Sequence, residues 1–518
     1  MVLGREDPEI HWFVAVMVYQ SYALLIAFGH MRDIIGTFFG FSRYAGKTKK
    51  EKRLACLLKS TETFYTRRLY HRIQDCWNRP IASNPGGYIE VMERSTEDNN
   101  FSLQTTGKTT RCLNLGSYNY LGFADDWKTT CRDNVMLTLR EYPMSACASR
   151  CEYGNLRVHE AVENTIAKFL KKEAAIVYNM GYNTNTTTIP VICTPGTLLV
   201  SDTLNHTSIV NGARASPALV RVFKHNDPAS LEDVLRESIV NGQPRFNRPW
   251  KKIIVLVEGI YSMEGAICNL KEIVKVCKKY KTYLYVDEAH SIGALGRTGR
   301  GVCEYEGVNP EDVDLLMGTF TKSFGGMGGY IAGSKKLINY IKETSAGFLH
   351  HNAMSPVVCQ QIISSLNIIS GKDGTSLGRT KLNRLRENSN YFRREMEKIG
   401  MHVYGDYDSP IIPCMIYFPA KIAAFSRECL RRKLAVVVVG FPATSVVLSR
   451  VRFCISAGHS IEDLSYAVAQ IDDIANIMCL KYSSNFLGRP LILSERRESE
   501  LELIEDKERY PHSRNKLH

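Results

Sequence analysis

Polar side chains that can take part in chemistry follow three apolar runs near the middle of the chain. The first run ends at Glu258, the second is followed by Asp287 and His290, and the third is followed by Lys322 within a stretch rich in Gly, Thr and Ser. In open parallel sheets, ligands bind beyond the carboxyl ends of the strands. If the three runs are neighbouring strands, these side chains therefore meet at one ligand site.

The combination of Lys322, Asp287 and His290 predicts a cofactor. Taken singly, the lysine fits an exposed surface position, the aspartate a helix N-cap and the histidine a buried core position. Together they match what pyridoxal 5'-phosphate needs: an amine that forms a Schiff base, a carboxylate that keeps the pyridine nitrogen protonated, and an imidazole that reaches the ring oxygen. We therefore expect a pyridoxal-phosphate site.

The segments that must position these residues alternate between short apolar runs and amphipathic stretches. Residues 158–170 and 270–280 have the apolar spacing of helices. The alternation predicts an α/β fold with a large, doubly wound, mostly parallel sheet, followed by a smaller C-terminal α+β domain. The expected strands cover residues 174–178, 198–201, 219–223, 253–257, 283–287, 315–319 and 330–333 in the large domain, and residues 411–417, 434–439 and 450–456 in the small one.

Two motifs around these residues resemble the α-oxoamine synthases. They are Val286-Asp-Glu-Ala-His-Ser-Ile-Gly and Gly318-Thr-Phe-Thr-Lys-Ser-Phe-Gly. Two others, Trp77-Asn-Arg-Pro and Val439-Gly-Phe-Pro-Ala-Thr, are similar to those of the catalytic second subunits of eukaryotic serine palmitoyltransferases, and the likeness covers roughly residues 60–480. The resemblance implies a PLP fold-type I, aminotransferase-like enzyme. It would condense L-serine with palmitoyl-CoA, a long-chain acyl-CoA, release carbon dioxide and form 3-oxosphinganine, the first step of sphingolipid synthesis.

The resemblance also implies a role for each site residue. Lys322 would carry the cofactor, His206 would stack on its ring, and Asp287 and His290 would hold the pyridine nitrogen and the phenolic oxygen. Phosphate contacts would come from backbone amides of Gly181 and Tyr182 at a helix start and from hydroxyls of Thr319 and Thr321. The remaining expected contacts are Ser262 near the phenolic oxygen, Asn119 beside the substrate, and Arg452 paired with the amino-acid carboxylate.

Three segments depart from the family pattern. Pro143 to Ser145 replace a glycine-rich stretch, Ser445 replaces a proline, and Phe348 to Met354 replace a stretch with hydroxyl side chains. These departures leave open the acyl-chain length, the amino-acid preference and the level of activity. A relative that uses glycine or alanine, or a weakly active regulatory subunit of the same complex, remains the alternative.

An apolar segment near the N-terminus predicts membrane attachment. Residues 10–31 contain no Asp, Glu, Lys or Arg. As a helix, a segment of this length can cross a hydrocarbon core of about 30 Å. A basic block follows between Arg43 and Arg53, and positive charge favours the cytosolic side. We expect a protein of the endoplasmic reticulum membrane with a cytosolic catalytic body, in which this helix spans the bilayer or lies in its plane. A buried or interfacial helix is the alternative.

Composition limits the other functions. The 518 residues are 44% hydrophobic and 23% charged, as in a folded globular protein, and the net charge is +13. Basic and aromatic residues do not cluster on a recognition element, so we expect no nucleic-acid binding. The 15 cysteines form no C-x-x-C pair, which is typical of reduced thiols. His350 and His351 lack further ligands at zinc spacing, so no metal site is expected.

The chain divides into five expected parts. They are a membrane segment (1–60), an N-terminal extension (61–110), a cofactor-binding domain (111–375), a small domain (376–480) and a charged tail (481–518). The resemblance further implies a homologous first subunit as partner, and small regulatory membrane subunits in addition. Three glycosylation sequons, at Asn100, Asn185 and Asn205, are expected to stay unmodified if the body is cytosolic.

Overall fold

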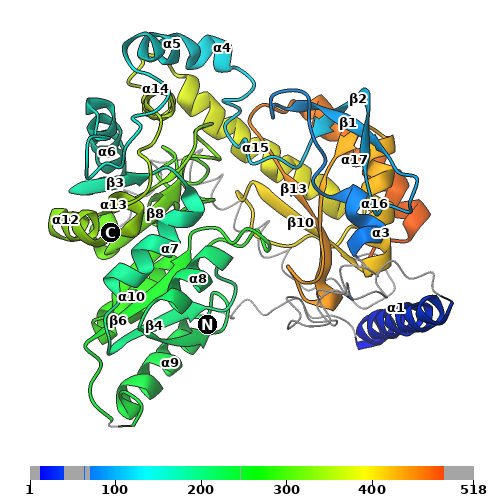
Figure 1. Ribbon diagram of the computed structural model, residues 1–518, viewed down its shortest axis with the longest axis horizontal. Helices are drawn as coiled ribbons and strands as arrows, with labels where there is room; N and C mark the ends of the chain where they lie inside the picture. The colour runs from blue at the N-terminus through cyan, green and yellow to red at the C-terminus, as the bar shows by residue number, and fades with distance from the viewer. Residues whose placement is uncertain (1–11, 40–63, 65–69, 246, 483–518) are drawn as a thin grey trace, which may run out of the picture.

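The computed structural model describes residues 12–39, 64, 70–245 and 247–482, which form two lobes and a long N-terminal helix (Figure 1). The larger lobe is built on a seven-stranded sheet with the order β3-β9-β8-β7-β6-β4-β5. Its strands are β3 (Ala174–Tyr178), β4 (Thr197–Asp202), β5 (Leu219–Phe223), β6 (Lys252–Glu258), β7 (Tyr283–Asp287), β8 (Leu315–Thr319) and β9 (Gly329–Gly333). Each lies within about a residue or two of its predicted run, and the mostly parallel α/β fold is confirmed.

Strand β9 is the exception to the parallel arrangement, because it runs antiparallel to both β3 and β8. The connection from β8 covers only residues 320–328. A parallel neighbour requires a crossover of a dozen or more residues, so this short link forces the chain to turn back. The same short link contains Lys322, which therefore lies just beyond the carboxyl end of β8.

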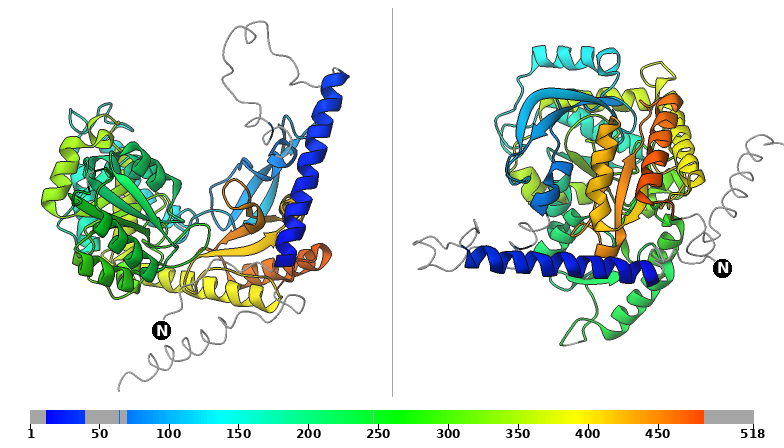
Figure 2. Two further views of the ribbon diagram at one scale, coloured as in Figure 1. Left: turned by 90° about the horizontal axis from the view of Figure 1, so that it is seen from below. Right: turned by 90° about the vertical axis from the view of Figure 1, so that its right-hand side faces the viewer.

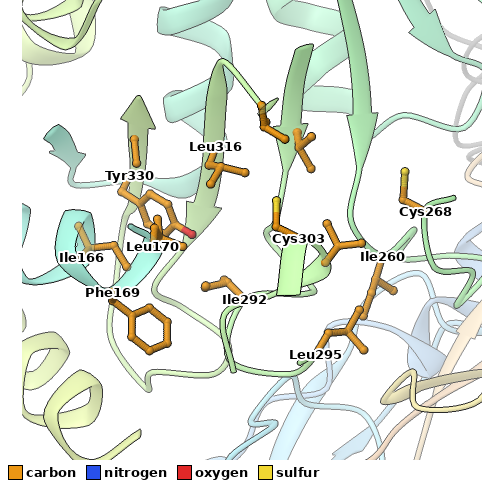
Figure 3. Close-up of a cluster of buried hydrophobic side chains, with 14 of the residues drawn as sticks. Ile166, Phe169, Leu170, Ile260, Cys268, Ile292, Leu295, Cys303, Leu316 and Tyr330 are labelled. Carbon is orange, nitrogen blue, oxygen red and sulfur yellow. The ribbon is translucent and has the colours of Figure 1, made fainter. Parts of the chain in front are cut away.

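Helices cover both faces of the large sheet. On one face, α6 (Arg157–Leu170), α9 (Pro228–Asn241), α10 (Leu270–Tyr280) and α14 (Pro356–Ile369) pack over Val255 and Val257, and Figure 3 shows part of this core. The other face is covered by α7 (Gly181–Ile192), α8 (Thr207–Ala215) and α12 (Lys335–Thr344), which pack over Ile254 and Leu256. Alternate residues of β6 thus enter opposite cores, as the pleat of a strand requires.

The smaller lobe contains two three-stranded sheets. One has the order β10-β13-β12, with β10 (Ile411–Tyr417), β12 (Val437–Val439) and β13 (Ser449–Cys454). In the other, the hairpin of β1 (Tyr88–Ser95) and β2 (Gln104–Asn114) is joined by β11 (Leu434–Ala435). The predicted strand 434–439 is therefore wrong as a single element, because the chain leaves one sheet and enters the other at Val436. This exchange ties the N-terminal extension to the small lobe.

Long helices complete the small lobe and connect it to the large one. Helix α15 (Leu377–Lys398) runs between the lobes, and α16 (Pro419–Arg431) and α17 (Ile461–Met478) pack on the small sheets (Figure 1). The core includes Phe392, Phe425 and Phe453. Short helices fill the connections: α3 (His71–Ile73), η2 (Gln74–Cys76), α4 (Trp127–Thr130), α5 (Arg132–Glu141), α11 (Val302–Tyr305), η3 (Pro310–Asp312), α13 (Ala346–Leu349) and η4 (Val446–Leu448).

The predicted membrane segment forms the single helix α1 (Trp12–Phe38), which lies along the edge of the small lobe (Figure 2). Among the described residues, it is the one helix long and apolar enough to cross a bilayer. Val14 and Val18 are buried against Met415 and Tyr417 of β10, whereas most other large apolar side chains of α1 are exposed. The basic block 43–53 and the tail 483–518 lie outside the described residues.

Candidate active site

The ends of β6, β7 and β8 bring the predicted site residues together. Glu258 and Asp287 are the last residues of β6 and β7 and are paired across the two strands. Asp287 is also paired with Met317 of β8, two residues before Thr319, which ends that strand. All three strands run in the same direction, so their terminal side chains lie at one edge of the sheet, as the sequence predicts.

Asp287 is a buried carboxylate whose hydrogen-bond donors in the described structure are neutral groups. Its oxygens accept hydrogen bonds from the Asn185 side chain (2.8 Å) and the backbone N–H of Ala289 (2.8 Å). Asn185 is itself fixed, because its carbonyl accepts a hydrogen bond of 2.6 Å from the Tyr285 hydroxyl. A carboxylate held in this way is oriented and ready to bind a cationic group.

His290 lies deep in the site between two tyrosines. Its Nδ1 shares a hydrogen bond of 2.8 Å with the Tyr120 hydroxyl, and its ring meets the Tyr118 ring edge-on at 5.3 Å between centroids. Burial and, next, the positive charge of Lys322 hold the pKa of His290 well below its usual value. The imidazole is therefore neutral and can share a proton with an oxygen atom.

Lys322 follows β8 and points its amine toward the aromatic residues of the site. Its Nζ lies 5.6 Å from the centre of the Tyr118 ring. Burial lowers the pKa of Lys322 to about 8, although the Asp287 and Glu258 carboxylates act in the opposite direction. A sizeable neutral fraction near physiological pH suits an amine that must act as a nucleophile or a base.

Arg452 projects from β13 of the small lobe toward the large one. Its Nη2 donates a hydrogen bond to the Tyr118 hydroxyl, and its guanidinium carbon lies 4.9 Å from the centre of the same ring. Its Nη1 donates to the carbonyl of Ser262 at 3.3 Å. The predicted Ser262 thus contributes its backbone oxygen here, in the loop that follows β6.

His206 caps the N-terminus of α8 beside the same strand ends. Its backbone N–H donates to the Glu258 carboxylate, and its Nδ1 lies 2.7 Å from the Ser208 hydroxyl. The ring is exposed and meets the Tyr182 ring edge-on at 6.0 Å between centroids. Desolvation lowers the pKa of His206, although the Asp287 carboxylate acts in the opposite direction. Its open face is available for stacking on a planar ligand.

The residues expected to contact a phosphate meet at the start of α7. Gly181 is the first residue of the helix, and a Cβ added there would lie 2.8 Å from the Thr319 hydroxyl. That hydroxyl lies 2.9 Å from the Thr321 hydroxyl and 2.9 Å from the Gly328 carbonyl, to which it donates. The structure brings Gly181, Tyr182, Thr319 and Thr321 together where the helix N-terminus favours a negatively charged group.

Asn119, which is expected beside the substrate, makes its side-chain hydrogen bonds to nearby parts of the protein. Its side-chain amide donates to the Pro85 carbonyl (3.2 Å) and the Asp125 carboxylate (2.9 Å), so it folds its own loop. The neighbouring Tyr118 and Tyr120 reach the site instead. Sequence reasoning missed both, although they flank Asn119 in Ser-Tyr-Asn-Tyr-Leu-Gly, and it also missed the Asn185 support of Asp287.

The departing segment 348–354 is hydrogen-bonded to residues 148–151, which follow the other departing segment at Pro143 to Ser145. The backbone N–H of Ala353 donates to the Ala148 carbonyl at 3.1 Å, and the Cys151 thiol donates to the Leu349 carbonyl at 2.9 Å. Asn179, two residues before Gly181, donates to the Asn352 carbonyl at 2.9 Å. The 348–354 segment thus links residues 148–151 to Asn179, just before α7. Within the described ranges, no cluster of metal ligands occurs.

Two of the three sequons are unsuited to glycosylation in the folded protein. The Asn185 amide contacts Asp287, and the buried Asn205 amide donates to the Ser201 hydroxyl and the Leu256 carbonyl, both at 2.8 Å. Asn100, in the β1–β2 connection, is the partly exposed one. The Asn100 amide also donates, to the Arg72 carbonyl and the Asp75 carboxylate, both at 2.9 Å, so its partial exposure is what makes it the better reporter of where the body lies.

Known proteins resemble the chain over most of its length. The family model "Aminotransferase class I and II" matches residues 110–471. Long chain base biosynthesis protein 2b of Arabidopsis thaliana is 55% identical over 473 residues, which are 91% of this chain and 96% of the relative. Serine palmitoyltransferase 2 of Dictyostelium discoideum is 46% identical, over 92% of this chain and 98% of the relative, and serine palmitoyltransferase 3 of Homo sapiens is 45% identical, over 93% and 87%.

Solved structures agree with this likeness. The serine palmitoyltransferase of Sphingomonas wittichii superposes with a TM-score of 0.71 at 26% identity, over 82% of this chain and 99% of that one. A high-resolution structure of SPT with a PLP internal aldimine gives a TM-score of 0.69 at 25% identity, over 79% and 94%. The chain therefore belongs to the class I and II aminotransferases and, within them, to the family of the serine palmitoyltransferases and long chain base biosynthesis protein 2.

Proposed function

We propose that this protein is a serine C-palmitoyltransferase that condenses L-serine with palmitoyl-CoA, with loss of carbon dioxide, to form 3-oxosphinganine. The observation that carries the proposal is the convergence of Lys322, Asp287 and Arg452 from two lobes on one site. An amine, a buried carboxylate and a buried guanidinium are the groups needed to bind a cofactor aldehyde, its ring nitrogen and an amino-acid carboxylate. The family membership supplies the acyl-CoA substrate.

The residues present fit pyridoxal phosphate. Asp287 is buried with neutral hydrogen-bond donors in the described part of the chain, so a protonated pyridine nitrogen would neutralise it. The close approach of Gly181 to Thr319 places the Thr319 hydroxyl beside the backbone at the start of α7, so hydroxyl and N–H donors for a phosphate lie next to each other, and His206 is exposed nearby. Lys322 would attach the cofactor, His290 would hold the ring oxygen, and Thr319 and Thr321 would donate hydroxyls to the phosphate.

The chemistry requires a proton to leave and return at the serine Cα. Bound pyridoxal phosphate withdraws electrons from that carbon. Lys322, with its lowered pKa, can accept the Cα proton as a neutral amine and later return one. Arg452 would hold the serine carboxylate until it is lost as carbon dioxide, and His290 keeps a neutral imidazole beside the ring oxygen. The palmitoyl thioester then acylates the activated carbon and CoA leaves.

Membrane and partner contacts follow from exposed apolar side chains. Helix α1 exposes an apolar surface suited to a bilayer, and the endoplasmic reticulum with a cytosolic catalytic body fits the proposed acyl-CoA substrate. Met180, Tyr182 and Met327 are exposed next to the cofactor residues. This exposure supports a homologous first subunit packed against the site, with small regulatory membrane subunits bound in addition.

The decisive experiment is a substrate comparison with the purified full chain and its co-expressed first subunit. Serine is expected to change the visible absorbance of the bound cofactor and, with palmitoyl-CoA, to yield 3-oxosphinganine and carbon dioxide. Glycine and alanine serve as matched amino acids that lack the hydroxymethyl group. Faster turnover with either one, or absence of cofactor absorbance in the wild-type protein, would contradict the proposal.

A further inference from the structure

Two arginines two positions apart on β13 point toward the large lobe. Val451 and Phe453 enter the core of the small lobe, so Arg450 and Arg452 lie on the opposite face of the strand. Both are buried, with exposed fractions of 3% and 5%. Both guanidinium groups contact the loop that follows β6, which belongs to the large sheet. The two side chains therefore contact the same loop of the large lobe, residues 262–264.

Arg450 makes contacts that are complete within the protein. Its Nη1 donates to the Met263 carbonyl at 2.8 Å and lies 3.4 Å from the Glu264 carboxylate, and its Nε donates to the Leu448 carbonyl at 3.0 Å. A buried guanidinium with a carboxylate and two carbonyls as acceptors is well compensated. These contacts hold the Nε and Nη1 donors of Arg450 within the protein.

Arg452 holds the same loop weakly. Its contacts there are the Ser262 carbonyl at 3.3 Å and the Met263 sulfur at 3.7 Å, both long for hydrogen bonds. Its Nε is buried without a partner in the described structure. A carboxylate that accepts two parallel N–H bonds is a stronger partner than these. Arg452 can therefore exchange its loop contacts for a substrate carboxylate, whereas the shorter bond to the Met263 carbonyl holds Arg450 on the loop.

The loop rests on the small lobe at a further point. Gly265 has φ +64°, and a Cβ added there would lie 2.5 Å from the Ile411 carbonyl of β10. The backbone N–H of Asp406 donates to the Gly265 carbonyl at 3.1 Å. These contacts fix the far end of the loop. When Arg452 turns to a substrate, Arg450 is the remaining side chain on β13 that holds the near end.

We infer that Arg450 is a positioning residue: it keeps Met263 and Glu264 against β13 so that Arg452 can exchange the Ser262 carbonyl for the amino-acid carboxylate without disturbing the site. The inference rests on the proposed function, because it assigns the carboxylate to Arg452. Without the Arg450 contacts, Arg452 is the only arginine of β13 that contacts the loop. The substrate carboxylate then competes with the Ser262 carbonyl for Arg452. The effect falls on amino-acid binding and not on cofactor attachment.

The test compares three variants of the full chain with cofactor bound. Arg450→Lys keeps the charge but loses the planar fork, and is expected to raise the KM for serine roughly tenfold with kcat changed less than about threefold. Glu264→Gln keeps the Met263 contact and should raise KM less. Arg427→Lys is the control, because Arg427 makes a bidentate pair with Asp75 (2.8 and 2.7 Å) away from the site.

Three readouts separate positioning from a general loss of structure. Cofactor absorbance without amino acid should match the wild type in all variants that fold, and thermal unfolding should show each of them folded at the assay temperature, while the serine concentration needed for the absorbance change rises in Arg450→Lys. An unchanged KM in that variant overturns the inference. Should Arg450→Lys fail to fold, an unchanged KM in Glu264→Gln overturns it instead. If serine does not change the cofactor absorbance of the wild-type protein, the proposed function alone is contradicted. The variants are then compared with glycine or alanine, which carry the same carboxylate.

Discussion

Tyr118 and Arg452 form a stacked and hydrogen-bonded pair that joins the two lobes. The guanidinium lies over the ring at 4.9 Å from its centre and also donates to the hydroxyl. The same ring is 5.6 Å from the Lys322 amine and contacts His290 edge-on. One tyrosine thus connects the group expected to bind the carboxylate with the group expected to carry the cofactor.

Tyr118→Phe is therefore expected to weaken serine binding. The change keeps the ring and removes the acceptor for Arg452, and a buried hydrogen bond to a charged group contributes about 1.5–3 kcal/mol, or roughly ten- to a hundredfold in KM. The KM for serine and the palmitoyl-CoA KM should be measured together, since the latter is expected to change little. Tyr466→Phe, which loses a bond of 3.1 Å to the Arg432 carbonyl at an exposed site, is the control. Equal KM values for serine in the two variants would disprove the role of the pair.

Lys322→Ala is expected to abolish covalent cofactor attachment and to lower turnover by roughly 10³-fold or more, because both the nucleophile and the base are removed. Little buried apolar surface is lost, so circular dichroism and thermal unfolding should stay close to wild type. Lys336→Ala, at an exposed position in α12, should behave like the wild type. Near-normal condensation by Lys322→Ala would refute the assignment.

Attachment of cofactor to the apoprotein should depend on pH through Lys322. The neutral amine is the reactive form, so the attachment rate is expected to rise as the pH approaches about 8 and to level off above it. Asp287 raises the pKa of this lysine and Arg452 lowers it. Asp287→Asn should therefore move the profile to lower pH, and Arg452→Gln should move it to higher pH. Stopped-flow absorbance measures the rates, and shifts in the same direction would contradict the electrostatic explanation.

Local sequence patterns predicted most strands because each apolar run is buried on both faces between helices, as with Ile254 and Val255 of β6. They could not predict the exchange of sheets at Val436, which depends on β2, more than 300 residues earlier in the chain. In the site, too, some residues could be found from local patterns and others could not. Asp287 and Lys322 follow strands and could be found from motifs, whereas Tyr118 meets Arg452 through a contact between lobes that no local pattern encodes.

Helix α1 packs on the small lobe near its first residues and carries charged residues near its last turn. Val14 and Val18 are buried on the small lobe, and Arg32 and Asp33 lie near the other end of the helix. The charge-free part that is clear of the lobe, residues 19–31, is shorter than the roughly 20 residues needed to span a bilayer. We therefore expect α1 to lie in the plane of the membrane, with its N-terminus on the cytosolic side.

A sequon-bearing tag placed before Met1 measures this topology in eukaryotic cells. Neither the tag nor Asn100 should be glycosylated, and deletion of residues 1–39 should release much of the protein from membranes, unless its partner retains it. The same tag on a lumenal reporter is the positive control. A glycosylated tag with unmodified Asn100 would show that α1 spans the bilayer, which requires Val14 and Val18 to leave the small lobe. A glycan on Asn100 would place the catalytic body in the lumen, away from the cytosolic pool on which the proposed acyl-CoA reaction depends.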